Sequence, residues 1–242
     1  MLVVTADTRE NYTLPEDYVK SLLSKMSSEM VEQQIGGKLI NVSSGRCYPG
    51  FSRAENAGRQ LTPVEGQEIV VGVDFNVDPG MHAYAMQFVG DDVFILTEIY
   101  LRGGDTPPLA REIERQFGTE GVVTHPDAAG GHHSTTGTSD HQILRDAGFK
   151  IRCRSKNPPI KNRVNAYNGR ILNALGERHL FIDPSCKLLR KDLEQCTWEV
   201  LFDGSYKGPL THPGAATGYA IEYKFPWLGQ SFAVGLPRQA FG

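Results

Sequence analysis

Apolar residues recur along this chain with two different periods, and the change of period divides the chain into two parts. Between residues 15 and 36 they recur at helical spacing, which predicts one amphipathic helix. The segment 38–56 lacks such a face and indicates a short strand or an extended arm. Dense, β-rich apolar runs begin at Ile69. We therefore expect an N-terminal connector or arm over 1–65 and a folded domain over 66–242.

Three β-rich runs separated by tight turns open the second part, and they predict an antiparallel meander with strands at 69–75, 81–89 and 92–101. Helical and strand patterns then alternate: helices at 108–117, 140–148, 160–175, 184–201 and from Gly214 to just before Pro226, and strands at 121–127, 149–155 and 179–183. This order is that of a mixed α/β fold. It indicates a ribonuclease-H-like domain: a mixed five-stranded sheet, with three antiparallel strands and then parallel additions, flanked by helices and preceded by an N-terminal helical arm.

Composition changes this picture little. Hydrophobic residues make up 40% of the chain and charged residues 22%, as in ordinary globular proteins. No apolar run approaches the roughly 20 residues that a membrane span needs, so we expect a soluble protein without a membrane partner. The four cysteines are scattered without a CxxC pair, which favours reduced thiols over disulfides or a zinc site.

Charge is distributed unevenly, and this points to a possible partner. The net charge is −3, yet the segment 145–170 carries eight basic residues and one acid, Asp146. Such a run is either a solvated surface or a surface that contacts phosphates. In the second case the candidates for DNA contact are Arg145, Arg152, Arg154, Lys156, Lys161 and Arg163.

Two apolar strand patterns end on a carboxylate. The run VVGVDFNVDPG places Asp74 in phase with its strand, and VVTHPDAAGG ends on Asp127. In a ribonuclease-H-like order these two strands are neighbours, so both side chains can point into one space. Two carboxylates that close repel each other unless they share a proton or a cation. Hard divalent ions such as Mg²⁺ or Mn²⁺ prefer these oxygen ligands, so we expect Asp74 and Asp127 to bind metal. The alternative for Asp127 alone is a turn or helix cap.

Two weaker candidates accompany this pair. Glu98 lies in the third predicted strand, where its side chain could face the site or the solvent. His125 precedes Asp127 and could contact substrate or water, or could have no role in the site.

These residues resemble a known family, the C-terminal nuclease domain of the large terminase subunit of tailed bacteriophages. IVVGVDFNVDPG looks like its first acidic strand and VVTHPDAAGG like its second. NPPIKNRVNAYNGRILNAL looks like the helix that follows, and EMVEQQIGGKLINVSSGRCYPGF like the segment that joins the motor ATPase to the nuclease. The resemblance covers nearly the whole chain. No GxxxxGK[ST] motif occurs, so the ATPase half is not part of this sequence.

The resemblance implies a specific activity and specific partners. It implies an endonuclease that uses two Mg²⁺ or Mn²⁺ ions to cut concatemeric double-stranded DNA during genome packaging. The implied partners are double-stranded DNA, the portal protein, the small terminase subunit and the ATPase domain of the same full-length protein. The implied location is the cytoplasm of a phage-infected bacterium, and not the mature virion.

The chain departs from the family at one important position. The family's last helix begins with a pattern like His-x-x-Asp-Ala-x-Gly-Tyr, whose Asp is the third metal ligand, whereas this chain reads HPGAATGY and has Ala215 there. Either the residue was replaced to disarm the nuclease, or the lineage has diverged, or the alignment is shifted. Asp203 could substitute only if its loop folds back. With alanine at 215 we expect impaired metal binding and little or no cleavage.

Other functions remain open on the sequence. The same fold could belong to a junction resolvase, a transposase core or another ribonuclease-H-like nuclease. Ala215 also suits a non-catalytic module that binds DNA or the portal during assembly. The stretch Gly72-Val73-Asp74 could be the phosphate loop of an actin-like or sugar-kinase fold, although such folds need a longer, duplicated chain.

Overall fold

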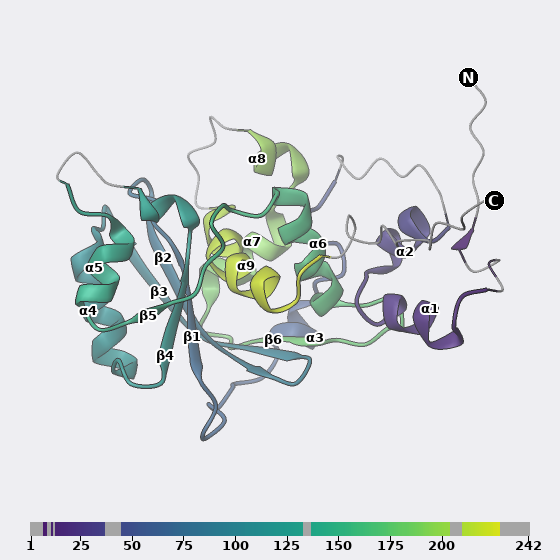
Figure 1. Cartoon of the computed structure of the whole chain (residues 1–242), viewed down its shortest axis with the longest axis horizontal. Helices are drawn as coiled ribbons and strands as arrows, with labels where there is room; N and C mark the ends of the chain where they lie inside the picture. The colour runs from purple at the N-terminus through teal and green to yellow at the C-terminus, as the bar shows by residue number, and fades with distance from the viewer. Residues whose placement is uncertain are drawn as a thin grey trace, which may run out of the picture.

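The computed structural model describes residues 7–8, 11, 13–36, 45–132, 137–203 and 210–227. It places helices on both faces of a central sheet, with a pair of short helices set apart at one end (Figure 1). None of the helices in these ranges has both the length and the apolar character needed to cross a membrane.

The sheet is mixed and has six strands in the order β5-β4-β1-β2-β3-β6. The strands are β1 Ile69–Asp74, β2 Gly80–Val89, β3 Asp92–Arg102, β4 Val122–Pro126, β5 Lys150–Ile151 and β6 Leu180–Ile182. The first three are antiparallel neighbours, and β4, β5 and β6 add in parallel at the two sides. This confirms the predicted ribonuclease-H-like order. The sheet has six strands rather than five because β5 and β6 both pair, one at each edge.

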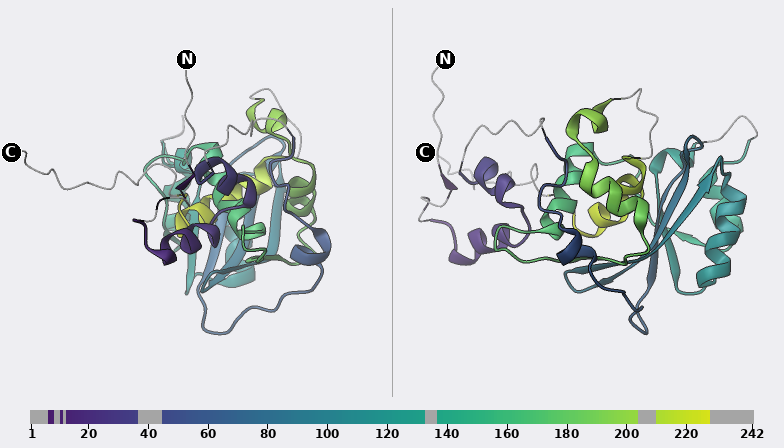
Figure 2. Two further views of the ribbon diagram at one scale, coloured as in Figure 1. Left: turned by 90° about the vertical axis from the view of Figure 1, so that its right-hand side faces the viewer. Right: turned by 180° about the vertical axis from the view of Figure 1, so that it is seen from behind.

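Two layers of helices cover the sheet. Helices α4 (Thr106–Phe117) and α5 (Asp140–Asp146) pack on one face through an apolar cluster that includes Val71, Val73 and Ile113. The other face carries α6 (Ile160–Ile171), α7 (Lys187–Gln195) and α9 (His212–Lys224). Figure 2, which turns the molecule to the side and to the back, shows both layers. Side chains that alternate along the central strands therefore meet one helical layer or the other.

Helix α9 lies unusually close to β1, and the sequence explains why. Gly214 and Gly218 admit Tyr48 and Arg163 on one side of the helix, and the small residues Ala216 and Ala220, four positions apart, form the side toward β1. Gly72 faces it from β1, where an added Cβ atom would stand 2.2 Å from the carbonyl oxygen of Ala216. Only glycine fits at this point, so the tight contact of α9 with β1 is specified by both elements.

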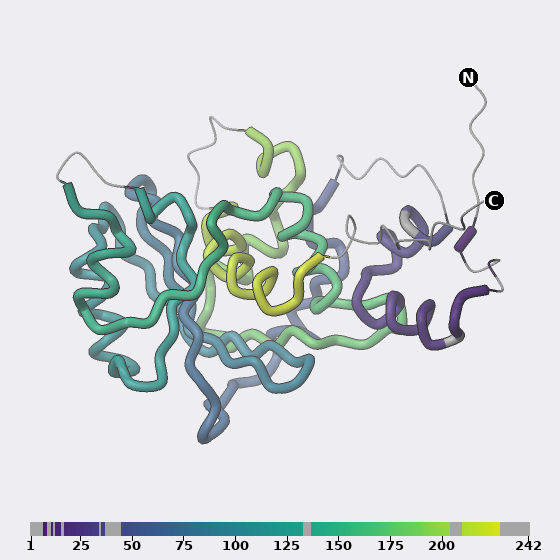
Figure 3. Tube along the Cα trace, in the orientation of Figure 1, coloured from purple at the N-terminus to yellow at the C-terminus, as the bar shows by residue number. Residues whose placement is uncertain are grey.

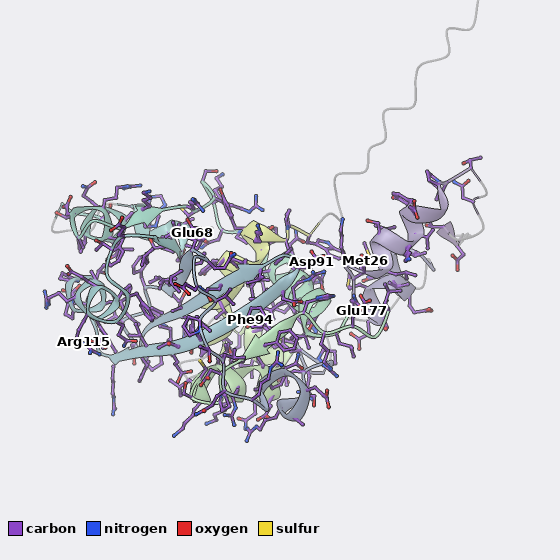
Figure 4. All side chains as sticks on the ribbon, turned by 90° about the horizontal axis from the view of Figure 1, so that it is seen from below. Met26, Glu68, Asp91, Phe94, Arg115 and Glu177 are labelled. Carbon is purple, nitrogen blue, oxygen red and sulfur yellow. The ribbon has the colours of Figure 1, made fainter. Side chains whose placement is uncertain are left out.

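The N-terminal arm contains two helices rather than the single helix predicted over 15–36. Helix α1 spans Glu16–Leu23 and α2 spans Ser28–Gln34. Between them the Ser24 carbonyl accepts hydrogen bonds from Arg170 and Asn173, each at 3.0 Å. These tertiary bonds satisfy a carbonyl that would otherwise need the next helical turn, and the chain bends there. Figure 3 traces the bend, and Figure 4 labels Met26 of the arm close to Asp91 at the β2–β3 turn.

The described part of the segment after the arm joins the main core. Residues 37–44 lie outside the described ranges, but Arg46 forms a single antiparallel bridge with Thr197, and α3 follows at Arg53–Ala57. Tyr48 and Phe51 are buried in the same core cluster as residues of α9. Residues that precede position 66 therefore contribute to the main core.

The bridge at Thr197 also divides the helix predicted over 184–201. Helix α7 ends at Gln195, and Thr197 caps the short helix α8 (Trp198–Phe202) by accepting a hydrogen bond from the Val200 N–H. All four cysteines carry free thiols, as predicted. The Sγ atoms of Cys47 and Cys196 lie 3.8 Å apart beside this bridge.

Candidate nuclease site and its comparison with known structures

Asp74 and Asp127 lie at the ends of adjacent parallel strands. The last registered pair of β1 and β4 is Val73 with Pro126, and the Asp127 N–H donates to the Val73 carbonyl at 2.9 Å. Asp74 and Asp127 follow immediately, in the next register position. Since paired residues of neighbouring strands point to the same face, both carboxylates face the layer that contains α9.

Asp74 is buried, with 6% of its surface exposed, and it is held by a histidine from α9. His212 Nδ1 lies 2.9 Å from Asp74 Oδ2, and His212 Nε2 lies 2.7 Å from the Asn76 side-chain nitrogen. The Asn76 nitrogen also lies 3.1 Å from Nδ1, so the ring proton is assigned to Nδ1 by the Asp74 carboxylate, which can only accept. This hydrogen bond offsets part of the cost of burying a carboxylate at a strand end.

Asp127 is held on both of its side-chain oxygens. Oδ1 accepts from the Ala129 N–H at 2.7 Å and from the Asn157 side chain at 2.6 Å. Oδ2 accepts from the Tyr219 hydroxyl of α9 at 3.3 Å. Asp127 also caps a short 3₁₀ helix, η2 (Ala128–Gly131), so its predicted cap role and its place in the site coexist.

The Tyr219 hydroxyl keeps its proton and therefore remains a donor. Burial raises the pKa of Tyr219, and the nearby Asp74 and Asp127 carboxylates raise it further against the opposing effect of Arg163. Its hydrogen bond to Asp127 is thus present throughout the neutral range.

One face of α9 serves both carboxylates, and Ala215 lies on that face. His212, Ala215 and Tyr219 are separated by three and four residues, the spacing that stacks side chains along a helix. His212 contacts Asp74 and Tyr219 contacts Asp127, so the residue between them lies over the space that separates the two acids. Ala215 is buried and presents only a methyl group to that space.

The residues present do not make a complete metal site. Among the described residues, no group of three or more His, Cys, Asp or Glu side chains is placed to hold a metal ion. Asp74 and Asp127 are suitable oxygen ligands for Mg²⁺ or Mn²⁺, but a two-ion centre needs more anionic oxygen than this pair supplies. The methyl group of Ala215 stands beside the space where a third ligand would be needed.

Five of the six predicted DNA-contacting residues divide into three groups. The Arg154 guanidinium is already paired within the protein, because it forms a bidentate salt bridge with Glu222 of α9 at 2.6 and 3.1 Å. Arg152 pairs with Glu68 at 2.8 Å while remaining exposed. Three further cations are exposed and have no ion-pair partner in the described ranges: Arg145, Lys156 and Lys161. Lys156 adjoins Asn157, which contacts Asp127, so this basic loop borders the carboxylates.

Arg163 is the unusual member of the set. Its side chain is buried, with 7% of the residue exposed, and its Nε has no hydrogen-bond partner. The guanidinium lies over the Tyr219 ring at 4.8 Å from the centroid, and no carboxylate of the described residues pairs with it. A buried cation without a counter-ion is costly, and its position next to Tyr219 places it beside the two acids.

The weaker candidates lie in other environments. Glu98 accepts hydrogen bonds from the Leu188 and Leu189 N–H groups and from Tyr84, so it caps the beginning of α7. His125 is buried beside Tyr223, and burial together with Arg152 lowers its pKa to about 4. Asp203 is exposed at the end of α8, and the loop 204–209 that would have to fold back lies outside the described residues.

Three residues of this site were not singled out from the sequence. His212 and Tyr219 stood in the quoted HPGAATGY, where a spacing of seven residues on a helix could have indicated a shared face. Asn157 carried no such signal, because a loop asparagine is usually a turn residue.

Comparison with solved structures decides the fold. The large terminase of a thermophilic bacteriophage superposes with a TM-score of 0.67 at 12% identity, over 90% of this chain and 54% of that chain. The complex of the same large terminase with ATP-γ-S gives 0.68 at 13%, over 89% and 54%. The P22 large terminase nuclease domain gives 0.56 at 11%, over 75% of this chain and 93% of that domain. This chain has the fold of a large-terminase nuclease domain.

The terminase nuclease fold is thus established by structural superposition, at sequence identities of 11–13%. No protein-family model and no curated protein sequence matches the chain. The chain spans about half the length of the thermophilic phage terminase, as the 54% coverage states.

Proposed function

We propose that this chain is the metal-dependent endonuclease domain of a viral large terminase, with a catalytic centre left incomplete by Ala215. The observation that carries the proposal is the placement of Asp74 and Asp127 on neighbouring parallel strands, both facing α9. The fold and the basic loop beside Asp127 support it.

The chain's own residues have distinct tasks in this proposal. His212 orients Asp74, while Asn157 and Tyr219 orient Asp127, so each carboxylate presents a fixed lone pair to the shared space. Bound Mg²⁺ or Mn²⁺ would supply an activated water and stabilise the leaving 3′ oxygen. Lys156 and Lys161 hold the DNA backbone without reading its sequence, since phosphate contacts carry no base information.

As it stands, the chain binds duplex DNA but cuts it slightly or not at all. A methyl group at 215 offers no oxygen to a cation, and no described residue completes a three-ligand group with Asp74 and Asp127. This makes a non-catalytic, DNA-binding role in assembly the second candidate for the chain in its present form.

The partners follow from the proposed identity. Double-stranded DNA is the substrate. The ATPase domain of the full-length protein, the portal protein and the small terminase subunit are the proposed protein partners, and the coverage of about half of the thermophilic phage terminase is consistent with a separate ATPase domain.

The deciding experiment restores the missing oxygen. We expect Ala215→Asp to bind Mn²⁺ measurably tighter by calorimetry and to nick and linearise supercoiled plasmid in Mn²⁺. Ala215→Asn is the matched control, because it has the same shape without the charge and should gain neither property. Asp74→Asn in the Ala215→Asp background should abolish the gained cleavage.

The outcomes separate the two candidates. Gain of both metal binding and cleavage supports the nuclease. If Ala215→Asp folds and binds duplex DNA but gains neither, the nuclease proposal fails and the assembly role is favoured.

A further inference from the structure

A hollow lies on the α9 side of the sheet, beside the site of the two carboxylates. It has a volume of about 350 Å³, and its walls include Glu68, His125, Arg152, Tyr223 and Lys224. His125 pairs in register with Gly72 and precedes Asp127 by two residues. At the rise of a β-strand the hollow therefore begins roughly 7 Å from Asp127, in the direction of the C-terminal turn of α9. Figure 4 labels Glu68, one of the lining residues.

The hollow has the charge of an anion site. Arg152 and Lys224 are both exposed, and Glu68 is the one carboxylate among its lining residues. Glu68 pairs with Arg152 at 2.8 Å. An incoming phosphate would meet two cations within one small concave surface, and guanidinium is the side chain best shaped for phosphate.

The hollow also contains a polar group that no described residue satisfies. His125 is 4% exposed, and its Nδ1 has no hydrogen-bond partner. Its ring is held edge-on by Tyr223 at 4.7 Å between centroids. Nδ1 is itself buried, so it meets no ligand in the hollow unless the ring moves, and His125 serves the hollow as part of its wall.

The wall of the hollow also contains an exposed aromatic ring. Tyr223 is 42% exposed, with the Arg154 guanidinium over its ring at 5.8 Å from the centroid, and Phe88 forms another part of the wall. Aromatic faces next to a basic groove are the usual means of holding an unpaired base. Glu68 and Gln67 supply polar groups at the rim that can meet a base edge.

We infer that this hollow is a nucleotide subsite: Arg152 and Lys224 bind a phosphate, and the attached base packs against Tyr223. The nucleotide is either free or part of an unpaired DNA strand. The inference goes beyond the proposed nuclease function, because it requires neither the carboxylates nor a metal ion.

The test is a binding titration in EDTA with the whole chain, using dAMP, inorganic phosphate and a short single-stranded oligothymidylate as probes. We expect saturable dAMP binding, with phosphate at least about fivefold weaker because it lacks the stacking contribution of a base. Arg152→Gln and Lys224→Gln should each weaken both ligands several-fold. Tyr223→Ala should weaken dAMP and leave phosphate unchanged. All three positions are exposed, so these variants should fold.

Arg111→Gln provides the matched control, because Arg111 is an exposed arginine of α4 on the opposite face of the sheet. It should bind every probe as the unaltered chain does. Competition between dAMP and the oligothymidylate identifies a subsite for a DNA strand, and dAMP binding without competition identifies a site for free nucleotide.

Three results would overturn the inference: no saturable dAMP binding at millimolar concentration, equal affinity for dAMP and phosphate, or equal loss with Arg111→Gln. Asp74→Asn should leave dAMP binding intact. Failure of the nuclease proposal and failure of this inference are therefore distinguishable.

Discussion

At the scale of single residues, the start of α9 depends on Asp192, a carboxylate that is entirely buried. It accepts hydrogen bonds from the Thr211 N–H at 2.8 Å and the Gly214 N–H at 2.7 Å. These bonds favour the ionised form, but burial outweighs them and raises the pKa of Asp192 to about 6. The residue that anchors the His212 end of α9 therefore changes charge close to neutral pH.

This pKa predicts how stability varies with pH. The folded pKa of about 6 exceeds the reference value of 3.8, so the folded state binds the proton more tightly. The resulting stabilisation, at most about 3 kcal/mol, is complete below about pH 4 and is lost as the pH rises through 6. Asp192→Asn cannot titrate, and it offers one oxygen where two N–H groups need acceptors.

Urea unfolding of both forms at pH 4.5 and 7.5 checks this prediction. The unaltered chain should exceed Asp192→Asn in free energy of unfolding at both values, and the gap should be larger at pH 4.5. Contributions of other titrating groups cancel in the difference. A gap that is equal at the two pH values would contradict the raised pKa.

Arg163 gives a second prediction at this scale. A buried, unpaired guanidinium costs free energy, so Arg163→Met, which keeps the aliphatic volume, should leave the free energy of unfolding unchanged or raise it. Duplex binding should weaken roughly tenfold, and the salt dependence of binding should become shallower because one phosphate contact is lost. Denaturation and filter binding at several salt concentrations measure the two effects. If instead stability falls and DNA binding is unchanged, Arg163 is only a structural residue.

The sequence indicated the acids but not the residues that hold them. The sequence singles out Asp74 and Asp127 because each ends an apolar run, where a charge needs an explanation; their neighbouring positions agree with the strand register, and their metal binding stays a prediction. Asn157 and His212 lie 30 and 138 residues from the acids they contact. Such contacts depend on how strands and helices pack, which local patterns do not contain.

At the scale of elements, the close packing of α9 on β1 is the contact that shapes the site. Gly72→Ala would place a Cβ atom 2.2 Å from the Ala216 carbonyl oxygen, which cannot move without shifting the helix. We expect a loss of about 1–3 kcal/mol or more in free energy of unfolding, as for other overpacked cores. Chemical denaturation measures this loss, and an unchanged midpoint would contradict the observed packing.

The elements that differed from prediction did so for tertiary reasons. The pattern over 15–36 is continuous, but Arg170 and Asn173 bind the Ser24 carbonyl and divide it into α1 and α2. The helix predicted over 184–201 is interrupted where Thr197 pairs with Arg46. Helical periodicity predicts which residues share a face, but a distant hydrogen bond decides whether the helix continues.

At the scale of the whole molecule, the arm has a small core of its own and a close contact with the body. Its helices bury a cluster that includes Leu22, Met30 and Ile35. The contact with α6 depends on Gly169, where an added Cβ atom would lie 2.1 Å from the Lys25 carbonyl oxygen. The packing of the arm against α6 therefore leaves no room for one added methyl group at Gly169.

Gly169→Ala tests this attachment. Alanine favours the helix by about 1 kcal/mol over glycine, so α6 itself should not suffer. We expect faster hydrogen exchange in α1 and α2, with core protection and the global unfolding midpoint retained. A global loss as large as that of Gly72→Ala would show that the arm is part of the cooperative core.

The shared dependence of both acids on α9 has a mechanical consequence. A single helix, α9, carries both the imidazole that hydrogen-bonds the first carboxylate and the phenol that hydrogen-bonds the second. A shift of this helix along its axis by a fraction of a turn would break both hydrogen bonds at once. A partner protein that displaces either end of this helix would therefore reorient both carboxylates together, without contacting either of them.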